Sequence, residues 1–67
     1  MIVLNGGACD LAAGESVLAV LGRLGLEPDA RGIAVAVDGE VVPRADWASV
    51  ALAAGARVEV LTAMQGG

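Results

Sequence analysis

The chain has 67 residues, a net charge of −4 and a largely aliphatic composition, and these properties exclude several classes of protein. A chain this short forms one domain, near the lower limit at which a core folds without disulfides or metal. Histidine, lysine and tyrosine are absent, so the usual general bases, Schiff-base amines and imidazole ligands are missing. We expect no bound metal or cofactor. Because an acidic surface repels nucleic-acid phosphates and anionic membranes, we expect neither as a partner.

Two sequence patterns that would indicate a location outside the cytoplasm are absent. No apolar run approaches the roughly 18–20 residues needed to span a bilayer. The amino terminus lacks a basic segment followed by an apolar one, which is the pattern of a signal peptide. We therefore expect a cytoplasmic protein.

The first predicted unit is a hairpin. Residues 1–4 are rich in β-branched side chains and end at Asn5-Gly6, a pair that favours the positive φ angles of a tight turn. Residues 8–11 form the returning strand. By the period-two rule, four side chains face the core, with the cysteine nearer the edge. These are Ile2, Leu4, Leu11 and Cys9.

The second predicted unit is a helix over residues 17–24. Ser16 is expected to cap its first turn through the hydroxyl, and Gly25 is expected to end it in a left-handed conformation. Apolar residues at i, i+3, i+4 and i+7 form one stripe. They are Val17, Val20, Leu21 and Leu24.

A second hairpin follows. Residues 33–37 are apolar throughout, which predicts an interior strand covered on both faces. Asp38-Gly39 is another turn signal, and residues 40–42 return as a short or edge strand because Pro43 cannot donate to a ladder.

The remaining chain returns to the sheet. We expect Asp46 to cap a single helical turn through residues 47–48, and Val50 and Leu52 to fill the core. In the last strand, residues 57–61, Val58 and Val60 point to one face, and the three alternating residues point to the other.

The order hairpin, helix, hairpin, turn and strand predicts an α+β protein with the β-grasp fold of ubiquitin-like proteins. Its mixed sheet has four to five strands packed on one helix, and the last strand lies beside the first. We place the folded domain at residues 1–61 and a flexible tail at residues 62–67. The tail ends on Gly66-Gly67, and since glycine has no Cβ it enters narrow passages that other residues cannot. A frayed chain end is the alternative interpretation of the tail.

The chain resembles the thiamine-pathway sulfur-carrier proteins over nearly its whole length. Short motifs in a fixed order carry the resemblance. They are Leu4-Asn5-Gly6, Gly14-Glu15-Ser16-Val17, Leu24-Gly25-Leu26, Val37-Asp38-Gly39-Glu40-Val41-Val42-Pro43-Arg44, Gly55-Ala56-Arg57-Val58-Glu59-Val60 and the terminal Gly66-Gly67.

This resemblance implies that the chain is a protein substrate and not an enzyme. An adenylating, E1-like activating enzyme uses ATP to convert the Gly67 carboxylate into an acyl-adenylate. A sulfur-donating persulfide protein then supplies the sulfur of a thiocarboxylate, which passes sulfur to thiazole synthase. The expected partner contacts are Gly66, Gln65, Met64, Ala63, Leu61, Trp47 and Arg44.

Several of these residues carry a second interpretation. Trp47 is either an exposed interface anchor or a lid over the core, and we favour partial burial. Arg44 either meets an acidic partner patch or is only solvated. Val3, Val42 and Leu61 form either an open apolar patch that docks partners or a second small core. Cys9 is favoured as a small hydrophobic residue over a sulfur-carrying thiol.

Two other functions remain open from the sequence. A small subunit of a molybdopterin-synthase-type enzyme shares the β-grasp body and the Gly-Gly end, although the short segment 37–44 favours the thiamine carriers. An inert β-grasp interaction module is the third hypothesis.

Overall fold

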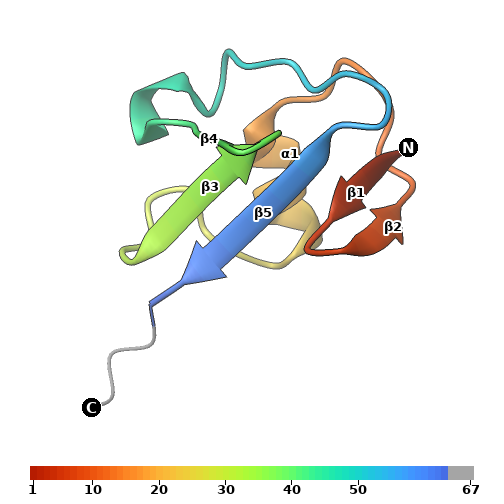
Figure 1. Ribbon diagram of the computed structural model, residues 1–67. Coiled ribbons are helices and arrows are strands. Elements are labelled where there is room, and N and C mark those ends of the chain that lie inside the picture. Colours follow the sequence, from red (N-terminus) through yellow and green to blue (C-terminus); the bar gives the residue numbers. More distant parts are fainter. Residues whose placement is uncertain (64–67) are drawn as a thin grey trace.

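A five-stranded mixed sheet with one helix against one of its faces forms the body of the protein, in a computed structural model that describes residues 1–63 (Figure 1). The strand order is β2-β1-β5-β3-β4. The strands are β1 (Ile2–Leu4), β2 (Gly7–Cys9), β3 (Ile33–Val37), β4 (Glu40–Val41) and β5 (Arg57–Thr62). The last strand, β5, lies centrally, parallel to β1 and antiparallel to β3. The predicted β-grasp fold is confirmed.

Both hairpin turns follow from their sequences. Asn5 and Gly6 have φ angles of 49° and 82°, and Asp38 and Gly39 have 51° and 86°, as two-residue hairpin loops require. A two-residue loop pairs Leu4 directly with Gly7. For this reason β2 begins and ends earlier than the predicted strand over residues 8–11.

The helix α1 (Val17–Arg23) is one residue shorter than predicted, and its two ends differ in how well the sequence described them. At the C-terminal end, Gly25 has φ 73°, and the Leu26 N–H donates to the Leu21 carbonyl at 2.9 Å, which completes a Schellman motif. At the N-terminal end, the predicted hydroxyl cap at Ser16 is wrong, because its side chain makes no capping hydrogen bond. Ser16 instead forms an isolated antiparallel bridge with Ala51.

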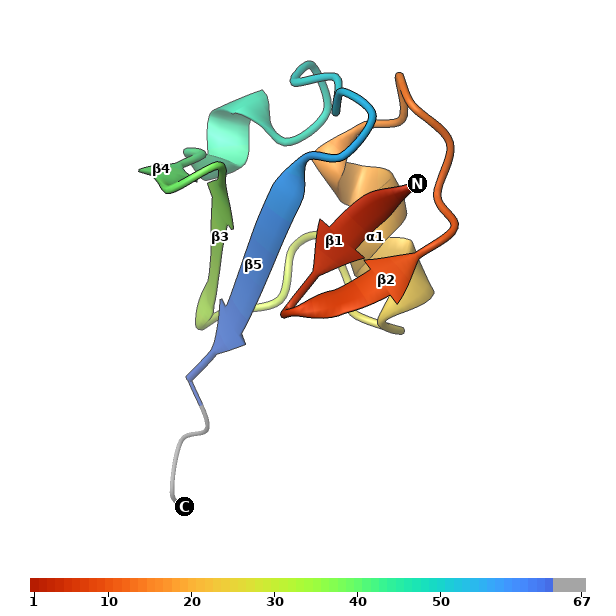
Figure 2. The ribbon, with the colours of Figure 1, turned by 45° about the vertical axis from the view of Figure 1, so that its right-hand side comes forward.

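The core lies between α1 and one face of the sheet. Val17, Val20 and Leu21 of the helix are buried as predicted, whereas Leu24 is 40% exposed beyond the last turn. In β3, only Val35 is buried, so the prediction that this strand is covered on both faces is wrong. Ala34 is exposed and Ala36 is only partly buried, so these two apolar residues do not mark a second covered face. Figures 1 and 2 show α1 on one side of the sheet and no element crossing the front of β5. We call this uncovered side the open face.

The segment between β4 and β5 closes one end of the core. It starts with the 3₁₀ turn η1 (Arg44–Asp46), whose N-terminal cap is Pro43 and not Asp46. Asp46 lies at the end of this turn, where its carbonyl accepts hydrogen bonds from the N–H groups of Ser49 and Val50. The predicted turn through residues 47–48 is therefore present, but it begins at the Asp46 carbonyl, and the Asp46 carboxylate makes no capping hydrogen bond within the described residues. Leu52, by contrast, is 1% exposed and fills the core as expected.

Candidate functional site

The C-terminal end of β5, where the chain leaves the sheet, is the part of the structure closest to the predicted reactive end. β5 extends to Thr62, which pairs with Ile33 at the start of β3, one residue beyond the predicted strand end. The N–H of Ala63 then donates to the carbonyl of Gly32 at 2.6 Å. We call residues 60–63, with Asn5 and Gly32 beside them, the outlet.

Asn5 holds one side of the outlet through its side chain. The Val60 N–H donates to Asn5 Oδ1 at 2.8 Å, and Asn5 Nδ2 donates to the Val60 carbonyl at 3.3 Å. The side-chain amide therefore takes the place of one more residue of β1, which ends at Leu4. This contact joins residues 55 positions apart in the sequence. The sequence predicts a turn at Asn5 but not this side-chain contact with β5.

Gly32 holds the other side. Its φ is 76°, which favours glycine, and a Cβ placed on it would lie 3.0 Å from the Ala63 carbonyl oxygen and 3.3 Å from the Ala63 Cβ. The backbone of Ala63 thus approaches Gly32 more closely than any other residue type would permit without a shift. The sequence pattern alone gave no sign of this close approach.

The open face carries exposed apolar side chains on neighbouring strands. Leu61 on β5 is 68% exposed and Val41 on β4 is 75% exposed. Ala34 lies opposite Leu61 in the strand register, and Ala36 lies opposite Val41. Of the predicted patch, Val3 and Leu61 lie on this face.

Val42, the third residue of the predicted patch, lies in the core and not on the open face. It is 9% exposed and packs in the core with the residues under α1. Its interpretation as part of an open patch is therefore wrong, and the interpretation as a second small core holds only in that Val42 is buried, since it joins the main core. Because Pro43 and η1 turn the chain over the end of the sheet, the side chain of Val42 lies under that turn.

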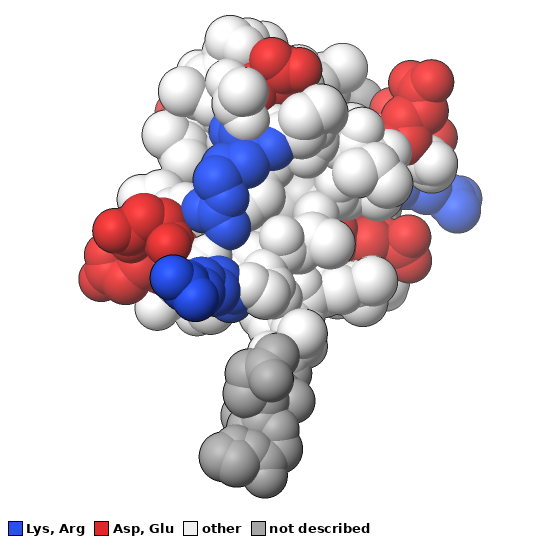
Figure 3. All heavy atoms as spheres, turned by 90° about the vertical axis from the view of Figure 1, so that its left-hand side faces the viewer, with Lys and Arg blue, Asp and Glu red and all other residues white. Residues whose placement is uncertain are grey.

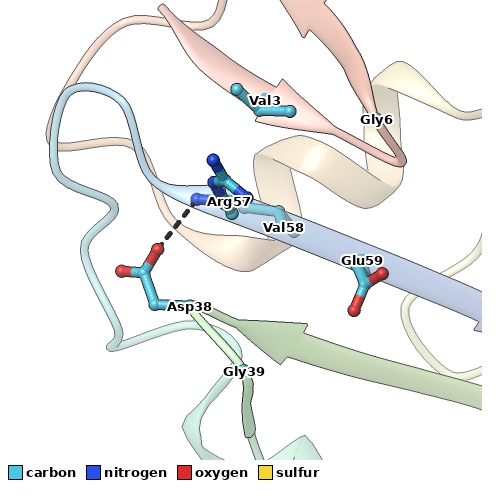
Figure 4. Close-up of a pocket in the computed structure, with 7 residues that line it drawn as sticks. All are labelled: Val3, Gly6, Asp38, Gly39, Arg57, Val58 and Glu59. Carbon is cyan, nitrogen blue, oxygen red and sulfur yellow. Dashed lines mark hydrogen bonds between the residues drawn. The ribbon is translucent and has the colours of Figure 1, made fainter.

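A shallow hollow on the open face lies between the tips of the two hairpins (Figure 4). Asp38 and Arg57 form its edge: the Arg57 N–H donates to Asp38 Oδ1 at 3.0 Å, and the Asp38 N–H donates to the Arg57 carbonyl at 2.7 Å. Glu59 lies further along the same strand (Figure 4). The lining of the hollow has no cysteine, serine or histidine, and the charged side chains of Asp38, Arg57 and Glu59 can make recognition contacts there.

Acidic and basic side chains lie near one another on two sides of the described part of the chain. Figure 3 views the side of the molecule that carries β3 and β4, and arginine side chains lie there next to acidic ones. On the opposite side, Arg23 pairs with Asp10 at 2.5 Å, and this hydrogen bond and charge raise the pKa of Arg23. Among residues 1–63, no three His, Cys, Asp or Glu side chains come close enough together to hold a metal ion.

Trp47 and Arg44 lie together, away from the open face. Trp47 is 3% exposed, and its Nε1–H donates to the Val42 carbonyl at 2.9 Å. It therefore acts as a lid on the core, and direct partner contact through its ring is incompatible with this burial. Arg44 is exposed, but it is not simply solvated, because its guanidinium stacks on the Trp47 ring at 4.5 Å and donates to two backbone carbonyls.

The remaining predicted residues divide into two groups. Cys9 is partly buried against the core at the end of β2, consistent with its interpretation as a small hydrophobic residue. Met64, Gln65, Gly66 and Gly67 lie outside the described residues. The structure therefore brings together Leu61 and Ala63 at the outlet, and it separates Trp47 and Arg44 from the open face.

Comparison with known proteins identifies the family. A family model described as the ThiS family matches residues 2–67. The chain belongs to the ThiS family. This is a family of non-catalytic sulfur carriers of thiamine biosynthesis, so the predicted resemblance is confirmed, and the molybdopterin-synthase and inert-module alternatives are set aside.

Solved structures agree with this assignment. The fold is similar to the crystal structure of a thiamine biosynthesis protein (ThiS) from Geobacter metallireducens, with a TM-score of 0.74 and 29% identity over 98% of this chain and 97% of that one. A solution NMR structure of a thiamine biosynthesis protein from the same organism gives a TM-score of 0.77 at 29% identity, covering 98% and 86% of the two chains.

A relative of a different size also matches. The ThiS-family chain is 36% identical over 66 residues to a thiazole synthase from Paramagnetospirillum magneticum. The match covers 98% of this chain but only 20% of that protein, so the chain spans about a fifth of the length of this relative. In the described part of the ThiS-family chain, α1 has seven residues, and no helix has the length and apolar character needed to cross a membrane.

Proposed function

We propose that this ThiS-family protein carries sulfur as a thiocarboxylate on the carboxyl group of Gly67, and that thiazole synthase receives it. The observation that carries the proposal is the family match, which continues through the Gly66-Gly67 pair. The described residues support it because the thiol of Cys9 is partly buried, and the hollow on the open face is lined by no cysteine, serine or histidine.

The proposed chemistry has three steps, all carried out by partners on this chain. Near pH 7 the carboxylate that Gly67 carries as the chain end is ionised and unreactive, since its reference pKa is about 3.3–3.7. An adenylating, E1-like enzyme joins a carboxylate oxygen to the α-phosphate of ATP and releases pyrophosphate. The terminal sulfur of a persulfide protein then displaces AMP from the acyl carbon. A second thiol reduces the remaining S–S bond and leaves the thiocarboxylate.

The chain itself supplies access and attachment. Gly66 and Gly67 have no Cβ, so the acyl carbon is approachable from either side in a narrow active site. Fixing the backbone of one residue on binding costs about 1–2 kcal/mol, which partners offset through backbone hydrogen bonds and contacts with Met64 and Gln65. The exposed Leu61 lies next to the outlet, so we include it in the surface that partners contact.

Thiazole synthase is proposed as the acceptor because of the large relative. That protein bears the name thiazole synthase, and a segment similar to this chain makes up 20% of it. A fusion of this kind places carrier and acceptor in one polypeptide, which favours a functional pairing of the two as separate chains.

Intact-mass analysis tests the proposal. The purified chain is incubated with the cognate activating enzyme, ATP and a persulfide donor with reductant. We expect a mass gain equal to one oxygen-for-sulfur exchange, confined to the C-terminal peptide. A chain lacking Gly67 and a Cys9→Ser chain serve as matched variants.

The two variants separate the possible carriers. Deleting Gly67 is expected to abolish the mass gain, whereas Cys9→Ser is expected to leave it intact. A gain that depends on Cys9, or that persists without Gly67, would contradict the proposal. Transfer to thiazole synthase is then followed by the loss of this mass when that enzyme and its substrates are added.

A further inference from the structure

The loop of residues 27–32, between α1 and β3, makes few backbone contacts of its own, yet it forms one wall of the outlet. Its internal backbone hydrogen bond runs from the Ala30 N–H to the Glu27 carbonyl at 3.0 Å. At its C-terminal end, the Gly32 carbonyl accepts from Ala63. The position of this loop therefore contributes, together with the pairing of Thr62 with Ile33, to where Ala63 is held as the chain leaves β5.

Arg44 connects the middle of this loop to the rest of the domain. Its Nη1 donates to the Pro28 carbonyl, and its Nη2 donates to the Ala30 carbonyl at 2.6 Å. Both carbonyls are reached by one guanidinium, because its N–H groups form a planar fork with fixed geometry. A lysine has one ammonium group at the end of a flexible stem, so it would not reproduce this two-point contact.

The guanidinium is itself held against the core. It lies 4.5 Å from the centroid of the Trp47 ring, a cation–π arrangement. The ring is 3% exposed, and its Nε1–H is bonded to the Val42 carbonyl. A buried, hydrogen-bonded ring is a rigid support for the arginine, so the guanidinium has a fixed surface to stack on.

These contacts form a continuous path from the core to the outlet. Trp47 supports Arg44, Arg44 holds the loop at Pro28 and Ala30, and the loop presents Gly32 to Ala63. The last contact is specific in shape, since a Cβ on Gly32 would lie 3.0 Å from the Ala63 carbonyl oxygen. The Arg44 contacts bridge 14 to 16 residues of sequence, so local propensity does not account for them.

We propose that Arg44 is a positioning residue for the carrier end: through the 27–32 loop it fixes the site and direction in which the chain leaves the sheet after Ala63. The expected effect on sulfur carriage rests on the proposed function. If the point of exit is fixed, the chain loses less conformational entropy when its C-terminal end enters a partner's active site. Freeing the backbone of one residue corresponds to about a 5- to 30-fold change in a binding constant.

The test compares Arg44→Met with Arg23→Met in the full-length chain. Both variants remove one guanidinium, but Arg23 pairs with Asp10 near the β2 edge of the sheet, at the opposite side from β4. The first readout is the ¹⁵N order parameter of the Ala63 amide. In the parent and in Arg23→Met we expect a rigid value near about 0.85, and in Arg44→Met a fall below about 0.6.

The second readout is the steady-state kinetics of adenylation by the activating enzyme. Arg44→Met is expected to raise KM by about fivefold or more, with kcat within about twofold, because chemistry in the bound complex is unchanged. Arg44→Lys retains the charge and much of the stem, and we expect its KM to lie between those of the parent and of Arg44→Met. Gly32→Ala breaks the same path at its last contact, so it is expected to raise KM in the same way.

The two readouts test two separate parts of the proposal. An Ala63 amide that stays rigid in Arg44→Met would overturn the proposed path. A mobile Ala63 amide with an unchanged KM would overturn the positioning role. If Arg44→Met fails to fold, as judged by the fluorescence of Trp47, then Arg44→Lys and Gly32→Ala provide the same comparison. If the parent chain is not adenylated at all, the proposed function fails, and the order parameters still decide whether Arg44 holds the outlet.

Discussion

The two faces of β5 differ in what they contribute. Val58 and Val60 face α1 and are 1% and 6% exposed, whereas Leu61 on the other face is 68% exposed. Arg57 and Glu59 share that open face with Leu61. One strand therefore stabilises the domain with one set of side chains and leaves the alternate set available for contacts with other proteins. A carrier needs this separation, because its partners must bind a surface whose residues are not required for folding.

The largest expected effect comes from the buried face. Val58→Ala removes two buried methyl groups and leaves a cavity, so we expect a loss of about 2–3 kcal/mol in the free energy of unfolding. A domain of this size has a stability of only about 3–5 kcal/mol, so a large part of it would be lost. Urea denaturation followed by Trp47 fluorescence measures the change.

Leu61→Ala is the matched control on the same strand. Because Leu61 is 68% exposed, its truncation is expected to change the free energy of unfolding by no more than about 0.5 kcal/mol. Equal losses for the two variants would contradict the separation of the faces.

The second effect concerns the outlet, where polar contacts replace apolar burial. Asn5→Gly retains a residue that tolerates the positive φ of 49° but removes both side-chain hydrogen bonds to Val60. We expect a loss of about 1–2 kcal/mol in the free energy of unfolding and faster hydrogen exchange at the Val60 amide.

Asn5→Asp sharpens this prediction. It retains an acceptor for the Val60 N–H but has no donor for the Val60 carbonyl, so its effect should be smaller than that of Asn5→Gly. Unchanged exchange at the Val60 amide in Asn5→Gly would show that β5 is held without the Asn5 side chain.

The smallest effect is expected at the exposed pair of Arg23 and Asp10. The pair raises the pKa of Arg23, so its stabilising effect is present below the ordinary pKa of arginine and is lost only as the pH rises through the raised value. The ordinary and the raised pKa of arginine both lie above the range from about pH 6 to about pH 9, so Arg23 contributes no pH dependence of stability in that range. Asp10→Asn should leave the thermal midpoint nearly unchanged. A clear fall would show that this surface pair matters more than its exposure indicates.

The elements that the sequence predicted correctly are those set by local rules. The two turns at Asn5-Gly6 and Asp38-Gly39, the Gly25 cap and the stripe of Val17, Val20 and Leu21 depend on residues close together in the chain. The errors fall where distant segments compete. Ser16 pairs with Ala51 rather than capping through its hydroxyl.

The candidate site was predicted less completely than the fold. Leu61 and Ala63 lie at the outlet, as the alternation of β5 and the position of the tail indicated. Of the two interpretations of Trp47, the lid over the core is the correct one. The roles of Asn5, Gly32 and Arg44 were not visible, since each acts on the backbone of residues far along the chain.

The amino-acid sequence was enough to define the strands, the helix, the family resemblance and a Gly-Gly end with no other reactive group nearby. Periodicity, turn chemistry and composition are properties of neighbouring residues, so they can be read without coordinates. The contacts that hold the outlet required the fold. They join side chains to backbone carbonyls and amides up to 55 residues away, and only the packing of β1, the 27–32 loop and η1 around β5 brings those groups within hydrogen-bond distance.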